Sequence, residues 1–383
     1  MSNIKPRVAI VSLRQRNNFV YNSCLYEFED IIAEVDDVDL IELLPTRGLA
    51  EFSYRVTRKS AAFIKPNTSS RPLLHNPIEL PKQYDLLFIV VDFPYNVILA
   101  NLINQWRQQS KVAVCYLIEL WKTELQKYKN YLKFLNNFDY VFLGHSQITE
   151  EVAAITQRPC AYLAPACDTL KFAPRSPDAP NSDRPIDICS MGRRSQITHK
   201  KLLQLTQKQD FFYHYDPQGG SELYLENHQA HRIFNANILK NTRYFIAHHA
   251  KINALDQTGG QIEIGYRFFE GAAAGAVMLG TAPKNSVFEE YFGWEDSVIP
   301  MAFDEPKIAE LIADLDTKPQ LLQEISNRNV KYSLLKHDWL HRWEQVLKAV
   351  GMTGTSKLEA RKAQLNQLAA SFDLDAADNL KLA

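Results

Sequence analysis

The sequence lacks the features that mark several classes of protein. Its five cysteines are odd in number and show no paired close spacing, so neither a zinc site nor a redox pair is expected. The longest apolar stretch, residues 112–121, is too short to span a bilayer and contains Glu119. The first residues contain no apolar run long enough for a signal peptide. These absences predict free thiols in a reducing compartment, and therefore a cytoplasmic protein.

A strong overall charge is also missing. The chain has 43 Lys and Arg against 44 Asp and Glu, which gives a formal net charge of -1. Such a chain has no overall field that would attract a polyanion, so nucleic acid is not expected as a partner. The length of 383 residues and the 46% hydrophobic content favour two globular domains.

Glycine is absent from the first strand-to-helix junction. Residues 12–18 read Ser-Leu-Arg-Gln-Arg-Asn-Asn. A dinucleotide fold needs glycines at this junction so that the backbone can approach a pyrophosphate. The chain also has no Gly-x4-Gly-Lys-Ser/Thr loop of the kind that holds phosphates in nucleotide hydrolases. A nicotinamide or flavin cofactor is therefore not expected, and no other cofactor is predicted.

What the sequence does contain is a regular alternation of apolar runs and stretches with helical spacing. In the first half, strands are expected at 8–13, 38–44, 84–91, 112–118 and 138–143, and helices at 23–35, 97–108 and 148–156. In the second half, strands are expected at 186–190, 211–215, 244–247 and 276–280, and helices at 198–207, 230–240, 268–274 and after residues 304 and 319. The pattern predicts an α/β protein of two Rossmann-like, doubly wound domains that face each other across a cleft.

A change of composition separates the two halves. Five prolines fall between residues 165 and 185, a density that a central strand does not tolerate. We expect an N-terminal domain at 1–168, a proline-rich linker at 169–185 and a C-terminal domain at 186–337. Residues 338–383 are expected to form a helix and tail that pack back on the N-terminal domain.

The second domain opens with residues suited to bind a diphosphate. Its first strand ends at Gly192, which is followed by Arg193 and Arg194, and the next helix carries Lys200. An arginine grips phosphate through its forked guanidinium, and a lysine adds a point charge. A solvated turn explains this segment equally well.

A second cluster lies at 265–280, where a run of small residues lets a helix pack closely on the sheet. Gly265 and Arg267 precede Glu270, which is expected near the helix start, where a carboxylate meets the positive end of the helix dipole. A carboxylate there can accept hydrogen bonds from both hydroxyls of a ribose, and Arg267 can reach a phosphate. The alternative is that Glu270 only caps the helix and the small residues only pack.

Together these segments resemble a known family. Gly192-Arg193 with Lys200, and the stretch 269–276, are similar to the donor-binding segments of GT-B-fold glycosyltransferases, above all the retaining family 4 type and its spore-maturation-protein-like relatives. Residues 164–174 resemble the interdomain linker of that family, and 138–146 and 239–248 resemble two of its strands. The likeness extends from about 138 to 349 and is only architectural before that.

The resemblance implies transfer of a sugar from a nucleotide-diphosphate donor, such as a UDP- or GDP-sugar, to a hydroxyl acceptor. It further implies retention at the anomeric carbon and no metal. Arg193, Lys200 and Arg267 would stabilise the leaving diphosphate. The chain departs from the family's Glu-x7-Glu motif, because Ile262 stands at the first glutamate position and Glu263 lies one residue away.

The acceptor, whether a glycan, a lipid-linked molecule or a small molecule, is expected to meet the loops of the first domain. Candidate contacts there are Asp92, Tyr95, Glu119 and Trp121. Glu119 stands where the family often has a histidine in the cleft and is predicted to take part in catalysis. A helix cap explains Asp92 equally well. His145, His248 and His249 lack companions at metal-ligand spacing and are expected in structural or substrate contacts.

Two questions stay open on the sequence. The basic stretch 52–77 is either a solvated loop with a short helix or a surface that faces the acceptor or a membrane. Besides a glycosyltransferase, the architecture suits a non-catalytic module that binds a nucleotide or a glycan, and also a sugar-nucleotide epimerase or a phosphorylase.

Overall fold

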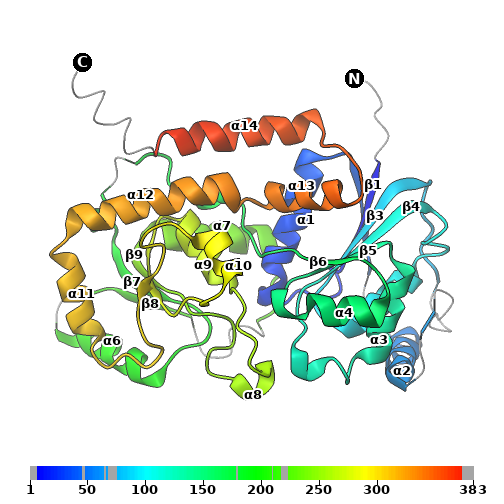
Figure 1. Cartoon of the computed structure of the whole chain (residues 1–383), viewed down its shortest axis with the longest axis horizontal. Helices are drawn as coiled ribbons and strands as arrows, with labels where there is room; N and C mark the ends of the chain where they lie inside the picture. The colour runs from blue at the N-terminus through cyan, green and yellow to red at the C-terminus, as the bar shows by residue number, and fades with distance from the viewer. Residues whose placement is uncertain are drawn as a thin grey trace.

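The computed structural model describes residues 7–44, 48–63, 66–67, 76–177, 180–208, 210–216 and 223–372. Two parallel β-sheets, each flanked by helices, form two domains that lie side by side (Figure 1). This arrangement confirms the predicted fold class.

The N-terminal sheet has six parallel strands in the order β2-β1-β3-β4-β5-β6. Its inner strand β1 is buried at all five positions, as is typical of a parallel strand that is covered on both faces. Val8 of β1 pairs with Val38 on one side and with Leu86 on the other. The strands are β1 (Val8–Ser12), β2 (Val38–Glu42), β3 (Tyr84–Val91), β4 (Ser110–Leu117), β5 (Tyr140–Leu143) and β6 (Cys160–Tyr162), with helices α1 (Ser23–Val35), α2 (Leu49–Phe63), α3 (Lys129–Phe134) and α4 (Thr149–Thr156).

The C-terminal sheet has five parallel strands in the order β11-β10-β9-β7-β8. They are β7 (Ile186–Ser190), β8 (Tyr213–Tyr215), β9 (Thr242–Ile246), β10 (Val277–Gly280) and β11 (Ile299–Pro300). The helices from the linker onward are α5 (Thr169–Phe172), α6 (Gln196–Lys208), α7 (His228–Lys240), α8 (Leu255–Thr258), α9 (Tyr266–Ala273), α10 (Ser286–Phe292), α11 (Ile308–Asp316) and α12 (Pro319–Lys336). Gly271 of α9 packs so closely on the sheet that an added Cβ would lie 2.5 Å from the ring of Phe245, which explains the run of small residues.

The last two helices, α13 (Trp339–Ala349) and α14 (Ser356–Ala370), return to the N-terminal domain (Figure 1). Trp339 and Trp343 belong to the same buried cluster as Val8, and the ring of Trp339 stacks on Phe28 with 4.6 Å between centroids. Arg361 of α14 forms ion pairs of 2.8 Å with both Asp168 and Asp338. These helices therefore tie the linker and the first sheet together.

One predicted helix is wrong. Residues 97–108 do not form an α-helix, because Pro94–Leu102 is a 3-10 helix and the chain turns at Gln105, whose φ is +45°. From Asn96 to Leu102 every residue is buried, so the segment has no solvent-facing stripe of the kind that an amphipathic helix needs. The basic stretch 52–77 contains most of helix α2, and its residues 64–65 and 68–75 lie outside the described part of the chain.

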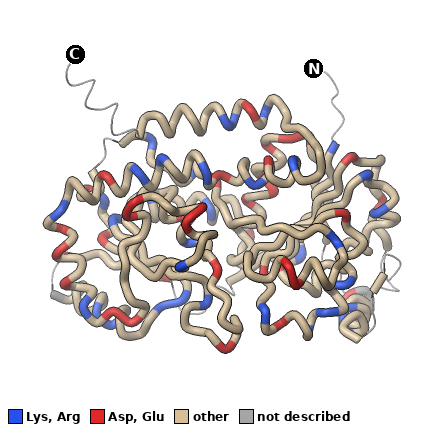
Figure 2. Tube along the Cα trace, viewed as in Figure 1, with Lys and Arg blue, Asp and Glu red and all other residues tan. Residues whose placement is uncertain are grey.

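The carboxyl edges of the two sheets face each other and are joined by several contacts, including those at the following two places. At one, the backbone N–H of Val20 donates to Leu223 over 2.9 Å, and that of Leu225 donates to Asn18 over 2.7 Å. At the other, the hydroxyl of Thr123 donates to the carbonyl of Gln257 over 2.6 Å. Acidic and basic residues are interspersed along both domains (Figure 2). Among the described residues, no helix combines the length and apolar character needed to cross a bilayer.

Candidate functional site

The first feature of the C-terminal edge is the turn after β7. Gly192 has a φ of +79°, a conformation that glycine adopts without steric cost. Its N–H donates to the carboxylate of Asp216, and Arg194 forms an ion pair of 2.9 Å with the same carboxylate. Arg193 is exposed instead and donates a hydrogen bond of 3.3 Å to Asn253. Arg194 is therefore held by Asp216, whereas Arg193 stays accessible to a ligand.

The start of helix α9 lies beside this turn. Gly265 is its N-cap and packs next to the loop after β9, where an added Cβ would lie 3.5 Å from the carbonyl of His248. Arg267, in the first helical turn, reaches back so that its Nη2 lies 3.7 Å from where a Cβ on Gly192 would be. Its side chain is 35% exposed. The structure thus brings Gly192, Gly265 and Arg267 together and leaves the Arg267 side chain partly exposed.

Glu270 is placed differently from what the sequence suggested. It lies in the second turn of α9 and not at its start, and it is only 2% exposed. One carboxylate oxygen pairs with Arg232, and the other pairs with Arg267 over 2.7 Å. Burial opposes its ionisation, but the two arginines outweigh burial and lower the pKa of Glu270. In this arrangement Glu270 holds Arg267 in place and presents little surface to a ribose.

Lys200 is exposed on the outer side of helix α6 and forms no ion pair with any residue that the structure describes. Its neighbour His199 turns inward, where Nδ1 lies 2.9 Å from the hydroxyl of Tyr213. A narrow crevice of about 10 Å³, room for about one water molecule, runs between Arg193, His199 and His248, and Lys200 is not among its lining residues. The geometry therefore does not bring Lys200 to the Gly192 turn.

Across from this edge, the loop after β4 carries the predicted residue Glu119. Its Oε1 accepts hydrogen bonds from Lys251 of the C-terminal domain over 2.9 Å and from Trp121 Nε1 over 2.5 Å. Its Oε2 lies 3.8 Å from Nε2 of His145. Burial opposes ionisation of Glu119, but the charges of His145 and Lys251 prevail and lower its pKa. Glu119 is therefore a carboxylate at the junction of the two domains.

Lys251 completes this junction. Its Nζ lies 4.6 Å from the centroid of the Trp121 ring, and the ring of His145 packs 4.2 Å from that of Trp121. The φ of Lys251 is +51°, a left-handed conformation that residues other than glycine rarely adopt. Strained backbone of this kind often occurs at functional sites.

Other predicted contacts of the N-terminal domain have structural partners. Asp92 is buried and accepts hydrogen bonds from Asn96 over 2.6 Å and from Asn17 over 2.5 Å. It therefore helps to fix the strand-to-helix junction that contains Asn17. Burial raises its pKa, although hydrogen bonds from Asn96 and the backbone oppose this. These contacts give Asp92 a structural role, but not as the cap of the helix Pro94–Leu102, whose N-cap is Phe93 without a side-chain cap bond.

Glu263 is the second buried carboxylate of the α9 region. It accepts from the backbone N–H groups of Ser146 and Gln147 over 2.8 and 2.9 Å, and from the hydroxyl of Ser146 over 2.9 Å. Glu263 therefore binds the start of a helix in the other domain, whereas its neighbour Ile262 is partly exposed. The glutamate next to the expected motif position is occupied by a contact between the domains.

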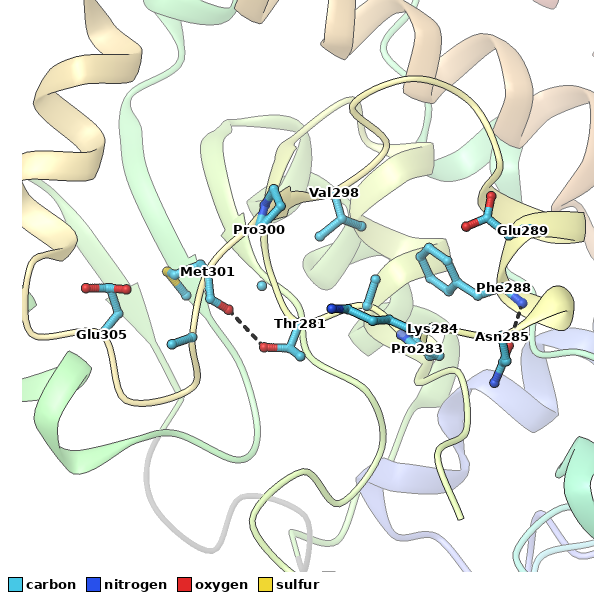
Figure 3. Close-up of a pocket in the computed structure, with 13 residues that line it drawn as sticks. Thr281, Pro283, Lys284, Asn285, Phe288, Glu289, Val298, Pro300, Met301 and Glu305 are labelled. Atoms are coloured by element: carbon cyan, nitrogen blue, oxygen red, sulfur yellow. Dashed lines mark hydrogen bonds between the residues drawn. The ribbon is translucent and has the colours of Figure 1, made fainter. Parts of the chain in front are cut away.

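A larger hollow lies at the carboxyl ends of β10 and β11 (Figure 3). Its volume is about 720 Å³, within the range of small-molecule sites. It adjoins the loop after β9, because the N–H of Thr281, which lines the hollow, donates to Nδ1 of His248 over 3.1 Å. The labelled residues that line it are Thr281, Pro283, Lys284, Asn285, Phe288, Glu289, Val298, Pro300, Met301 and Glu305.

Sequence reasoning missed this hollow, Lys251 and Arg232. The hollow lies after the predicted strand 276–280. The polar residues that follow Gly280 could therefore have indicated a ligand site there. Lys251 and Arg232 left no signal, because each pairs with a glutamate of the other domain. Among the described residues there is no group of three or more side chains suited to hold a metal ion.

Comparisons with known proteins agree with this geometry. The sequence model of a family described as glycosyl transferase-like matches residues 220–348, about a third of the chain. No match was found among curated proteins. Among solved structures, HepE of Anabaena in complex with UDP-glucose is 12% identical, with a TM-score of 0.51 over 90% of this chain and 99% of that one. An alpha-glucosyltransferase in complex with UDP and a DNA containing an HMU base is 11% identical, with a TM-score of 0.53 over the same shares.

These matches confirm the GT-B fold and the predicted resemblance to GT-B glycosyltransferases. They leave the subgroup within that class as a prediction.

Proposed function

We propose that this chain, which has the GT-B fold and carries a glycosyl transferase-like segment, transfers a sugar from a nucleotide-diphosphate donor to a hydroxyl acceptor. The observation that carries the proposal is the placement of Arg267 beside the Gly192 turn at the carboxyl edge of the C-terminal sheet. In doubly wound sheets, ligands bind at this edge. UDP-glucose and UDP in the two similar structures suggest a UDP-sugar, and a GDP-sugar is the second candidate.

In this proposal, cationic side chains stabilise the departing diphosphate. Arg267 contacts it directly, because its guanidinium is partly exposed and fixed by Glu270. Arg193 approaches from the same turn as Gly192, and Lys200 adds a more distant positive charge from α6. Such preorganised charge stabilises the leaving group in the transition state. We assign Glu270 to holding Arg267, since its buried carboxylate cannot reach both hydroxyls of a ribose.

The acceptor side of the reaction is assigned to the Glu119 junction. A carboxylate, an imidazole and an ammonium group meet there between the two domains, and such groups suit the hydroxyls of a sugar. We propose a glycan, a lipid-linked molecule or a small molecule as acceptor, with Glu119 as its contact. The hollow at the carboxyl ends of β10 and β11 has room for the transferred sugar.

We also propose retention of configuration and independence from a metal, both of which the resemblance implies. Arg193, Lys200 and Arg267 would supply the positive charge that a divalent cation supplies in other transferases. Proton NMR of the first product tests retention of configuration. Activity after EDTA treatment tests independence from a metal. An inverted anomer or a loss of activity restored by Mg²⁺ would overturn the respective statement.

A second candidate function is a non-catalytic module that binds a nucleotide or a glycan. It is favoured by Ile262 in the position of the first motif glutamate and by the burial of Glu270. Slow hydrolysis of a sugar nucleotide distinguishes the two, because a transferase usually passes its sugar to water when no acceptor is present. An epimerase would convert the donor without releasing the nucleotide, and a phosphorylase would need inorganic phosphate.

Binding of nucleotides to the purified protein tests the leading proposal. We expect UDP or GDP to raise the melting temperature, and Arg193→Ala to reduce this shift, because the variant removes an exposed cation from the turn. Arg328→Ala is a matched control, since Arg328 forms its ion pair with exposed Glu295. A protein that responds to neither diphosphate would not be a nucleotide-sugar transferase.

We further propose that the protein works in the cytoplasm and contacts a membrane surface through helix α2. Leu49, Phe52, Val56 and Phe63 are all exposed and recur on one face of this helix, with Phe63 at 86% exposure. Arg55 and Lys59 flank this face. An apolar stripe with basic flanks suits an anionic lipid surface.

Co-sedimentation with vesicles of phosphatidylglycerol and phosphatidylcholine tests the membrane contact. We expect the wild type to sediment with the vesicles and a Phe52→Ser, Phe63→Ser variant to stay in solution. Phe234→Ser, which removes an exposed ring from the C-terminal domain, is the control and is expected to sediment like the wild type. Equal sedimentation of all three proteins, or of none, would contradict the contact.

A further inference from the structure

Arg232 is a buried arginine that bridges the two domains behind the candidate site. It lies on helix α7, its side chain is 4% exposed, and its guanidinium packs 4.8 Å from the centroid of the Phe172 ring. Nη2 pairs with Glu27 of helix α1 over 2.9 Å, and Nη1 pairs with Glu270 of α9. One guanidinium therefore joins a carboxylate of the N-terminal domain to a carboxylate of the C-terminal domain.

Both carboxylates have further partners. Glu27 accepts from Lys171 over 3.1 Å, from the N–H of Asp168 over 3.1 Å and from Trp339 Nε1 over 3.3 Å. Glu27 is thus fixed by the linker and by helix α13. On the other side, Glu270 holds Arg267, whose Nη2 lies beside the Gly192 turn. A continuous series of ion pairs runs from the linker through Glu27, Arg232 and Glu270 to Arg267.

The orientation of Arg267 depends on Arg232, because both arginines pair with the single carboxylate of Glu270. Glu270 is shared between two arginines, one on each of its oxygens. Without Arg232, its buried charge would have a single cationic partner, and a carboxylate can accept two parallel bonds from one guanidinium. Arg267 would then be drawn onto both oxygens and away from the turn. With Arg232 on the other oxygen of Glu270, Arg267 bonds to Glu270 through Nη1 and can direct its Nη2 to a ligand.

We propose that Arg232 is a positioning residue for the donor diphosphate, and that it acts by keeping Arg267 directed toward the Gly192 turn. This inference rests on the proposed function, in which Arg267 contacts the diphosphate. Because Arg232 is itself fixed by Glu27, it also makes the affinity for the diphosphate depend on how the N-terminal domain is placed. Neither Arg232 nor Glu27 is required to touch the ligand.

A purely structural role is the alternative. Buried ion pairs often stabilise the fold when intact and destabilise it strongly when one partner is removed. In that case, variants would unfold at lower temperature, but the folded protein would bind its ligand as before. The two roles are separated by the affinity for a nucleoside diphosphate relative to the corresponding monophosphate, because Arg267 is assigned to the diphosphate and not to the base.

The experiment measures by calorimetry the affinities of the full chain for UDP and UMP, and for GDP and GMP. Arg232→Lys keeps the charge but cannot pair with both glutamates through a fork, and Glu27→Gln removes the anchor in the other domain. Arg243→Gln is the control, because Arg243 pairs with Asp187 and Asp316 within the C-terminal domain and has no contact with the series.

We expect the ratio of diphosphate to monophosphate affinity to fall about tenfold in Arg232→Lys, within the usual size of coupling between linked sites. A smaller fall in the same direction is expected in Glu27→Gln, and no change in Arg243→Gln. If Arg232→Lys does not fold, Glu27→Gln alone decides. An unchanged ratio with a lowered melting temperature would overturn the inference and leave the proposed function intact. Failure of the wild type to bind any of the four nucleotides would overturn both.

Discussion

The carboxyl edges of the two sheets have the same parallel topology but opposite polar chemistry. At the N-terminal edge, Oε2 of Glu29 accepts from Ser12 over 2.6 Å and from Arg14 over 2.8 Å, so the arginine after β1 is paired with a buried carboxylate. At the C-terminal edge, Arg193 is exposed and Arg267 keeps a solvent-facing side. The fold alone therefore does not decide which domain binds a phosphate. What distinguishes the two edges is how much of their arginines stays exposed after pairing, because the Arg267 side chain is 35% exposed and that of Arg14 is 17% exposed.

The largest expected effect comes from removing the partly exposed arginine at the start of helix α9. Arg267→Gln is expected to weaken binding of UDP or GDP by roughly 10- to 100-fold, since a hydrogen bond to a charged group contributes about 1.5–3 kcal/mol. Calorimetry on the purified variant measures this. Arg14→Gln, which removes an arginine from the N-terminal edge, is the matched control and is expected to lower stability without changing nucleotide affinity. If Arg14→Gln weakened nucleotide binding and Arg267→Gln did not, the donor would bind at the N-terminal edge, which would contradict the proposal.

The next effect tests the turn at the C-terminal edge. Gly192→Ala is expected to cost roughly 1–2 kcal/mol in free energy of unfolding, because an alanine does not adopt a φ of +79° freely. Gly351→Ala is the control, since Gly351 has a φ of +71° with open space around it and lies far from the edge.

Chemical denaturation should show a similar loss of stability in both glycine variants, and titration with UDP or GDP should show weaker binding only in Gly192→Ala. The added methyl group would lie 3.7 Å from Arg267, where the phosphate is expected. Equal binding by the two variants would mean that the turn has no part in the site.

The smallest effect concerns the junction between the edges. Glu119→Gln is expected to reduce transfer to an acceptor by about fivefold, since a partly exposed ion pair contributes up to about 1 kcal/mol. Affinity for the donor nucleotide should stay the same. A change in donor affinity without a change in transfer would move Glu119 out of the acceptor site.

The same variant has a signature in the pH dependence of unfolding. The pKa of Glu119 is lowered in the folded protein, so its contribution to stability is present above the ordinary value of 4.5 and is lost as pH falls from there through the lowered pKa. Wild type should therefore lose more stability than Glu119→Gln below pH 4.5. Parallel curves for the two proteins would contradict the interaction with Lys251.

Much of the fold could be predicted because its local patterns agree with its tertiary structure. The apolar runs at 84–91 and 186–190 became strands β3 and β7 with the same bounds, and 23–35 became helix α1. The prediction for 97–108 failed because residues 97–102 form a fully buried 3-10 helix, which apolar spacing alone does not distinguish from an α-helix. Pro94 and the turn at Gln105 explain why a 3-10 helix forms there instead.

The candidate site was predictable only where its residues are close in sequence. The Gly192 turn, Arg267 and Glu270 were each identified from short motifs, and the structure places Gly192 and Arg267 together. Partners that come from different domains were not predictable, because the pairing of Glu119 with Lys251 and of Glu27 with Arg232 depends on how two domains pack. For the same reason, the burial of Glu270 could not be read from its motif.

The most direct test of the account is an experimental structure of the protein with UDP or GDP bound. The account predicts that the diphosphate lies within hydrogen-bonding reach of Arg267 and beside the Gly192 turn, with Glu270 still paired to Arg232. A diphosphate bound near Arg14 at the N-terminal edge, or bound with Arg267 turned away from it, would contradict the central claim.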